Sequence, residues 1–370
     1  MVPDSRYRYQ RYRIHPFAIV RRGGSTPATC VRDPEESPIT MGTPSPDPIE
    51  FHSPTTTSGT PVRRRRTVAD RALSARRLLL DAAAETYDGD LDIDWSAPID
   101  PEKHWLPDQL STIHGTWLWH RMGTEQRATL AKHELANLLT LAIYADAARS
   151  MLLFRDIIEA SGPADDETRA ALAAIHADSR TMAMFGRMVH KSGLAPYRRP
   201  LLAQAVSRLV LLTPRNTATS AVTLLIQQAI HDIAAVIADD PQVQPHLRQL
   251  MKIHCVGARR NLAYAHDQLL AEIDEHGTIS NRLAALWAAL ATVALYPAII
   301  AARPYRAAGV SPKHALPTAY ASGHYTEAAG AITESFVRQG IAAGLFDGPL
   351  TTTILRLGRV WPGSIPRRHR

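Results

Sequence analysis

The chain has 370 residues, of which 45% are apolar and 21% charged, and its formal net charge is +7. This length and composition suffice for one large hydrophobic core or two smaller ones, so disorder throughout the chain is excluded. No stretch of 18 residues is wholly apolar and uncharged, and residues 17–20 are too short for the core of a signal peptide. We therefore expect a cytoplasmic protein without a membrane partner.

The excess positive charge lies near the N-terminus. Residues 1–80 hold 14 arginines and 7 acidic residues, and the rest of the chain carries equal numbers of basic and acidic residues. Residues 1–66 are rich in Pro, Ser, Thr and Arg, a composition that cannot bury enough apolar surface to offset chain entropy. We expect a disordered basic leader over 1–66, either an arm that touches nucleic acid or an extension without function. The second interpretation is preferred, so nucleic acid is not an expected partner.

The remainder of the chain has the apolar spacing of long helices. Apolar residues recur three and four positions apart from Leu130 to Ile158, the pattern of an amphipathic helix. Similar stripes, separated by Gly, Pro and Asp breakers, follow over 166–190, 198–212, 219–238, 243–273, 280–302 and 323–343. No convincing alternation of β-branched residues occurs. The sequence predicts an all-α, up-down helical bundle in a single domain over 67–360, followed by a basic tail over 361–370.

Bundles of this kind can hold two metal ions between facing helices. Such a site takes one carboxylate from each of two helices, and a carboxylate and a histidine three residues apart from each of the other two. A spacing of three places both side chains on one helix face. His254 lies near the start of a long apolar helix that suits this arrangement.

The order and spacing of several stretches resemble the AurF-like proteins, the p-aminobenzoate N-oxygenase family. These stretches are Asp92–Trp95, Ile113–Trp119, Glu125–Arg127, His133–Asn137, Asp178–Phe185, Asp239–Pro245 with Ile253 and His254, Phe336–Ile341, and Leu355–Gly358. The resemblance covers roughly 85–360. It implies a ferritin-like helical core with additional helices and a non-haem di-iron centre that oxidises arylamines with dioxygen.

The first two ligand helices keep shortened carboxylates. The resemblance places the family's first metal-binding glutamate at or near Asp146 and the next at Asp178, and aspartate is one methylene shorter than glutamate. The histidine expected three residues after Asp178 is Thr181. These two helices thus retain acidic groups and lose an imidazole.

The third and fourth ligand helices lose more. The third glutamate falls near Gln228, where the chain offers Gln227 and Gln228, and neutral amides bind iron poorly. On the fourth helix His254 is retained, while the next glutamate and histidine positions hold Ala258 and Asn261. Two irons are therefore not expected.

Three residues at the family's ligand positions still carry donor groups. Asp146, Asp178 and His254 would together form a weak mononuclear iron site. In the simpler interpretation, His254 is a buried histidine satisfied by hydrogen bonds. The two aspartates are then solvated, or paired with nearby Arg149 or Arg180.

Two hypotheses about function follow. The first is a non-catalytic member of the fold, without a cofactor, which acts as a binding or scaffold protein. It would hold a small molecule in the bundle cavity, or pair with a second copy or an active relative. The alternative is an active dioxygen-dependent oxygenase of the arylamine N-oxygenation type, with a reduced or unconventional iron site. The loss of charged ligands favours the first, because unpaired charges are costly inside a metal-free core.

Overall fold

The computed structural model describes residues 68–84, 87, 89, 91–159, 165–197 and 215–362, and most of these residues lie in helices. These residues contain no β-strand, only an isolated bridge between His104 and Val243. The predicted all-α helical bundle is therefore confirmed for this part of the chain. The leader expected over 1–66, the helix predicted over 198–212 and residues 363–370 of the expected tail lie outside the described residues.

The long helices follow the predicted stripes closely, and shorter helices join them. The described helices are α1 (Val68–Ala84), the 3-10 turn η1 (Asp108–Leu110), α2 (Trp117–Arg121), α3 (Thr124–Glu159), α4 (Asp166–Lys191), α6 (Thr217–Asp239), α7 (Pro245–Glu275), α8 (Thr278–Ile299), α9 (Ala302–Ala307), α10 (Pro312–Ala321), α11 (Gly323–Ala342) and α12 (Pro349–Leu357).

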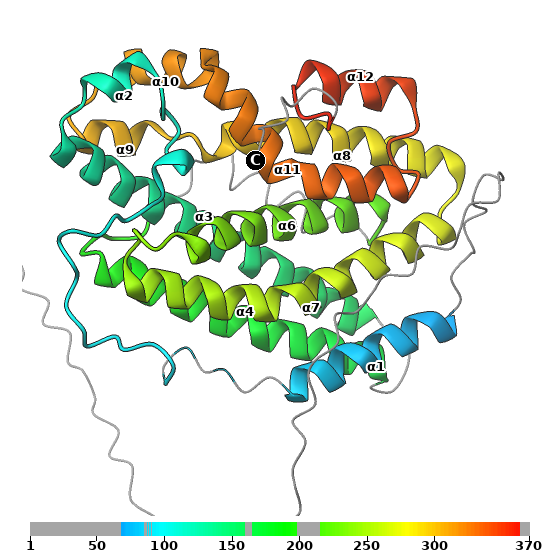
Figure 1. Cartoon of the computed structure of the whole chain (residues 1–370). Coiled ribbons are helices and arrows are strands. Elements are labelled where there is room, and N and C mark those ends of the chain that lie inside the picture. The colour runs from blue at the N-terminus through cyan, green and yellow to red at the C-terminus, as the bar shows by residue number, and fades with distance from the viewer. Residues whose placement is uncertain are drawn as a thin grey trace, which may run out of the picture. The chain divides into compact units, whose positions relative to one another are not determined.

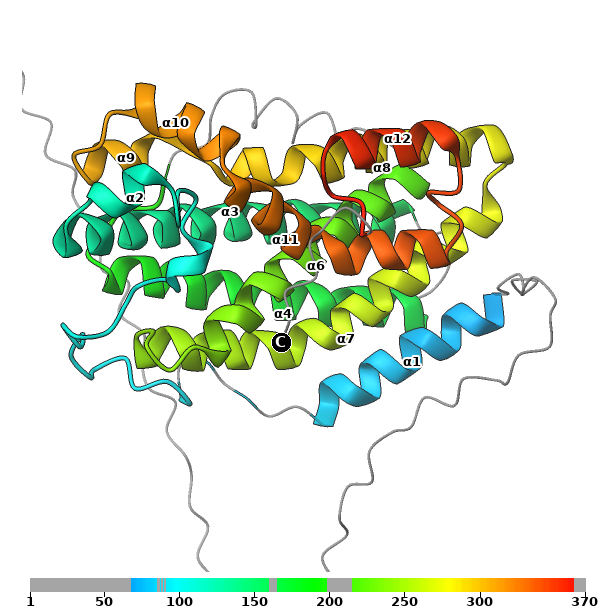
Figure 2. The same cartoon turned by 45° about the horizontal axis from the view of Figure 1, so that its top comes forward.

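Two helix pairs build the centre of the bundle. The helices α6 and α7 pack along one another, and so do α3 and α4 (Figure 1). The helix α1 packs across α4 and α7, whereas α8 and α11 cover α6 on the side away from α1 (Figure 2). The four central helices are those on which the sequence places the candidate metal positions.

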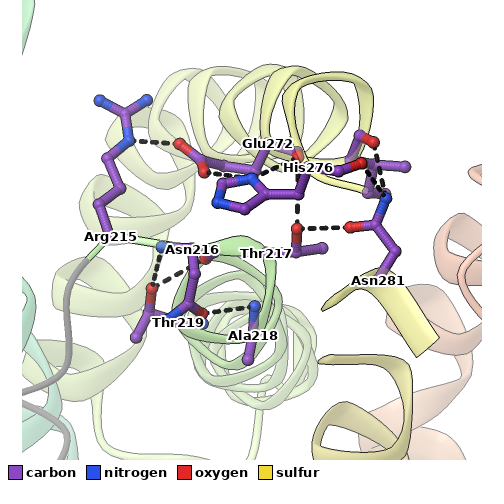
Figure 3. A network of polar contacts seen from close by, with 9 residues as sticks. Arg215, Asn216, Thr217, Ala218, Thr219, Glu272, His276 and Asn281 are labelled. Carbon is purple, nitrogen blue, oxygen red and sulfur yellow. Dashed lines mark hydrogen bonds and ion pairs between the residues drawn. The ribbon is translucent and has the colours of Figure 1, made fainter. Parts of the chain in front are cut away.

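A polar junction fixes the start of α6 against the end of α7 and the start of α8 (Figure 3). Asn216 caps α6, because its side chain accepts hydrogen bonds from the backbone amides of Ala218 and Thr219. Thr217 donates to Asn281 at 2.8 Å, and Arg215 binds the buried carboxylate of Glu272 on α7. These bonds satisfy helix-end groups that would otherwise lack partners.

A second set of hydrogen bonds fixes the other end of the α6–α7 pair, where the chain turns from α6 into α7. The Gln244 side chain is fully buried and donates to the carbonyls of Asp100 and Lys103 at 2.7 and 3.0 Å. The backbone of His104 bonds to Gln242 and Gln244 on either side of the isolated bridge. The α6–α7 pair is therefore held at both ends.

Two apolar segments have the length and hydropathy of a membrane-crossing helix. They are α6 and the segment Thr278–Ala307, which spans α8 and α9. Within the most apolar 18 residues of each, 50% are buried in α6 and 39% in Thr278–Ala307. The lower share on α8 reflects an exposed face that includes Leu283, Trp287 and Leu290. This segment is not wholly apolar, because Thr292 and Pro297 interrupt it. α6 lies between α7, α8 and α11, as a core helix does.

A buried carboxyl group joins α3 to the loop before α2. Glu134 is 5% exposed and accepts hydrogen bonds from the backbone amide and hydroxyl of Thr112. The Thr112 hydroxyl also contacts the Tyr305 hydroxyl at 2.6 Å. Burial raises the pKa of Glu134 to about 7, against the hydrogen bonds from Thr112 and Ser111.

A first prediction concerns Gly340 on α11, where a Cβ atom would lie 2.4 Å from the ring of Phe346. Because that ring is buried, Gly340→Ala is expected to lower the free energy of unfolding by about 1–3 kcal/mol. Gly186→Ala on α4 is the matched control, since nothing lies within 4 Å of its Cβ position and alanine favours a helix by about 1 kcal/mol. Denaturant titration should show that Gly340→Ala lowers the free energy of unfolding and that Gly186→Ala raises it. Equal effects of the two substitutions would contradict the close packing of Gly340 against Phe346.

A second prediction concerns the pH dependence of stability. Below pH 4.5 Glu134 is protonated in both the folded and the unfolded protein. Between pH 4.5 and about 7 only the folded protein keeps the proton, so the free energy of unfolding falls as pH rises through this range. Relative to the native protein, the free energy of unfolding of Glu134→Gln should therefore rise by on the order of 3 kcal/mol across this range. Denaturation at a series of pH values measures the difference, with the exposed Glu102→Gln as control. A difference that does not change with pH would contradict the prediction.

Candidate functional site

The four central helices bring the predicted positions to one cavity. Asp146 on α3, Asp178 on α4 and His254 on α7 all line it, together with Gln227 on α6. The cavity has a volume of about 150 Å³. All four side chains are buried. Segments more than 100 residues apart in the sequence thus converge as the resemblance implied.

A buried ion pair lies at the α3 side of the cavity. The Arg149 guanidinium binds Asp178 Oδ1, and Ser150 donates to Asp178 Oδ2 at 3.2 Å. Both members of the pair are about 5% exposed. Burial raises the pKa of Asp178, while Arg149 and Ser150 act in the opposite direction. Asp178 is therefore paired and is not solvated, and its partner is Arg149. Arg180, the other arginine considered, is exposed and donates to the backbone oxygen of Tyr87.

Asp146 has a neutral partner. Gln227 Nε2 donates to Asp146 Oδ1 at 2.9 Å, and Oδ2 has no hydrogen-bond partner among the described residues. Burial, followed by the neighbouring Asp178 carboxylate, raises the pKa of Asp146 to about 7. The expectation of a solvated or ion-paired group therefore fails for Asp146, which is 2% exposed and bonded to an amide.

His254 is buried, as expected, but among the described residues Nε2 does not have the hydrogen bond that was expected with it. Its ring contacts Phe185 with centroids 5.3 Å apart, and Nε2 lacks a partner within the described part of the chain. Burial, with smaller contributions from His231 and Arg149, lowers the pKa of His254 to about 4. The imidazole is therefore uncharged at neutral pH.

The third ligand position belongs to Gln227 and not to Gln228. Adjacent residues on a helix point about 100° apart, so only one of the two can face the cavity. Gln228 lies outside the cavity lining, where it donates to Asp232 at 2.8 Å and accepts from Gln339 on α11 at 3.1 Å. Of the two glutamines considered for the third ligand position, Gln227 is therefore the one that lines the cavity.

The remaining replaced positions also line the cavity. Thr181, Ala258 and Asn261 lie there as the resemblance implied, and Asn261 is 7% exposed. Its Oδ1 atom has no partner among the residues that the structure describes. Neutral side chains thus line the cavity at the positions where the resemblance implied a histidine or a glutamate.

One wall of the cavity was missed in the sequence. Ala82 on α1 and Tyr87 just beyond it line the cavity. The sequence signal for this wall is the pair Ala75 and Leu78, three residues apart and both buried, which dock α1 into the core. The apolar spacing of α1 shows that the helix packs on the core, but it does not show that the helix covers this cavity.

The residues present do not fit the di-iron centre that the family implies. Two iron ions need several anionic ligands and imidazoles, and the cavity lining offers two carboxylates and two imidazoles, of which His176 is exposed. One of these carboxylates already binds the Arg149 guanidinium. Across the described residues, no group of three or more His, Cys, Asp or Glu side chains is arranged to hold a metal ion.

Comparison with known proteins agrees with the fold. The family model described as P-aminobenzoate N-oxygenase AurF matches residues 68–339, which include every helix that lines the cavity. A search of the curated proteins finds no match. Because the family model covers well over half of the 370 residues, the chain belongs to the AurF family, whose fold is that of a di-iron oxygenase.

Proposed function

We propose that this chain is a non-catalytic, metal-free member of the AurF family that binds a small molecule in the cavity between its central helices. The observation that carries the proposal is the ion pair between Arg149 and Asp178. A metal-binding carboxylate must present free lone pairs to its cation, whereas Asp178 is engaged by a guanidinium and a hydroxyl. Arg149 thus supplies the positive charge that a metal ion would otherwise bring to Asp178.

The neutral replacements support the same proposal. At the positions where the family's pattern places glutamates and histidines, the cavity has Gln227, Thr181, Ala258 and Asn261. Each change removes a charged or basic group from a buried place, and in the absence of metal such groups would be costly there. The changes are therefore consistent with one another as an adaptation to a core without metal.

An active oxygenase with a single iron is the second candidate, and one observation favours it. Asp146, Asp178 and His254 line the same cavity, and Asp146 Oδ2 and His254 Nε2 lack partners among the described residues. The Arg149 pair argues against it, because a cation beside Asp178 repels the guanidinium. Iron content distinguishes the two candidates.

The purified full chain, incubated anaerobically with ferrous iron and then desalted, is expected to retain less than about one iron per chain, because too few anionic ligands remain. Elemental analysis measures the retained iron. The His254→Ala variant sets the background, since any iron that it keeps is bound elsewhere. One iron per chain that His254→Ala loses would support the single-iron oxygenase, and two tightly bound irons would overturn the proposal.

Stability tests the role of Arg149 directly. Arg149→Met leaves Asp178 buried without its cation, so the free energy of unfolding should fall by about 3–5 kcal/mol. The double variant Arg149→Met with Asp178→Leu should recover most of that loss, because an apolar pair of similar size avoids the unpaired charge.

The matched control is an exposed pair on α11. Arg338 binds Glu334 four residues earlier, with side chains 65% and 37% exposed, so Arg338→Met should cost less than about 1 kcal/mol. A stable Arg149→Met variant that acquires tightly bound iron would show instead that Asp178 is a metal ligand held in reserve.

A further inference from the structure

Three of the side chains that line the cavity each have a buried polar atom without a hydrogen-bond partner among the described residues. These atoms are Asp146 Oδ2, His254 Nε2 and Asn261 Oδ1, on side chains that are 2%, 8% and 7% exposed. Each buried polar atom left without a hydrogen bond costs about 1–3 kcal/mol. Three such atoms around one cavity therefore indicate an occupant that satisfies them.

The chemistry of these atoms defines what the occupant must offer. The Asn261 oxygen accepts hydrogen bonds, Asp146 Oδ2 accepts when the carboxyl group is ionised, and neutral His254 accepts at Nε2 when Nδ1 carries the proton. Two other polar groups of the cavity are already engaged, since Gln227 donates to Asp146 and Asp178 binds Arg149. The occupant must therefore be rich in hydrogen-bond donors.

The charge balance of the cavity indicates the sign of the occupant. Arg149 balances Asp178, whereas Asp146 is bonded only to the neutral amide of Gln227. The lining also includes His176 and Arg180, which are exposed and lie at the rim, and the partly buried Arg260. At the buried end, beside Asp146, a cationic group is therefore favoured.

The volume limits the size of the occupant. A cavity of about 150 Å³ is large enough for a ring of the size of benzene. The apolar part of the lining comes from Ala173, Ala177, Met184, Ile253 and Ala258. A compact apolar body fits beside these side chains.

We infer that the cavity binds a small primary ammonium ion with a compact apolar body, its nitrogen directed to Asp146, His254 and Asn261. The inference rests on the proposed metal-free function. An ammonium group has three N–H donors for the three acceptors. An arylamine has two N–H donors and is uncharged at neutral pH, so it matches neither the number of acceptors nor the charge.

Calorimetric titration of the metal-stripped full chain tests the inference with benzylamine, benzyl alcohol and aniline as probes. Because hydrogen bonds between charged groups are roughly twice as strong as neutral ones, benzylamine should bind at least about tenfold more tightly than either neutral probe. Asp146→Asn should abolish this preference, and Asn261→Leu should weaken benzylamine binding severalfold. Glu134→Gln alters a buried carboxyl group outside the cavity and should bind as the native protein does.

Ala258→Leu gives an independent test, because it fills the cavity without removing a polar group and should block benzylamine. Melting curves first establish which variants fold. Equal binding of the three probes, or no binding by the native protein, would overturn the ammonium inference and leave the metal-free function standing. Two irons per chain would overturn the proposed function itself. The two failures are therefore distinguishable.

Discussion

The structure depends on how two carboxylates are accommodated where four long helices meet. Removing an ionised group from water costs several kcal/mol unless a partner compensates. Asp178 on α4 has Arg149 and Ser150 on α3, and Asp146 on α3 has Gln227 on α6. Each carboxylate is therefore bonded by side chains from another helix, although Asp146 Oδ2 has no hydrogen-bond partner among the described residues, and these bonds join α3, α4 and α6. In the proposed metal-free protein, these bonds take the place of the metal ions that join the helices of a di-iron bundle.

The position of α7 in this core is set from its ends. The junction around Glu272 fixes the C-terminal end of α7 against α6 and α8 (Figure 3). At the other end, Gln244 fixes the N-terminus of α7 against the loop at Asp100. A helix rises 1.5 Å per residue, so a helix held at both ends cannot slide by one residue without breaking one set of bonds. His254 therefore faces the cavity although it has no polar partner there among the described residues. The frame of the site does not require a metal.

The sequence predicted the long helices because apolar spacing reports burial, and α3, α4, α6, α7, α8 and α11 appear where the stripes lie. Details that depend on contacts between helices could not be predicted. Arg180 is two residues from Asp178 and nearer in sequence than Arg149, but residues two apart on a helix do not face each other. The true partner comes from another helix, at a distance that only the fold sets. The choice between Gln227 and Gln228 likewise depends on the rotation of α6, which a stripe fixes only to within a residue. The helix ends also differ from the predicted ranges by a few residues, because capping side chains set them: α6 begins directly after its cap Asn216 and not at residue 219.

The substitutions at the cavity are best understood as one electrostatic change. If a single ligand were lost, the remaining carboxylates would still need a cation, and the site would be left with buried negative charge. Here the glutamate and histidine positions are neutral at Thr181, Gln227, Ala258 and Asn261, and Arg149 balances one of the two remaining acids. What stays is one carboxylate without a positive partner among the described residues, beside two further unsatisfied acceptors. That remainder is far too small a charge for two metal ions. A core that had simply discarded its function would be expected to lose Asp146 as well, because an apolar residue would be more stable there.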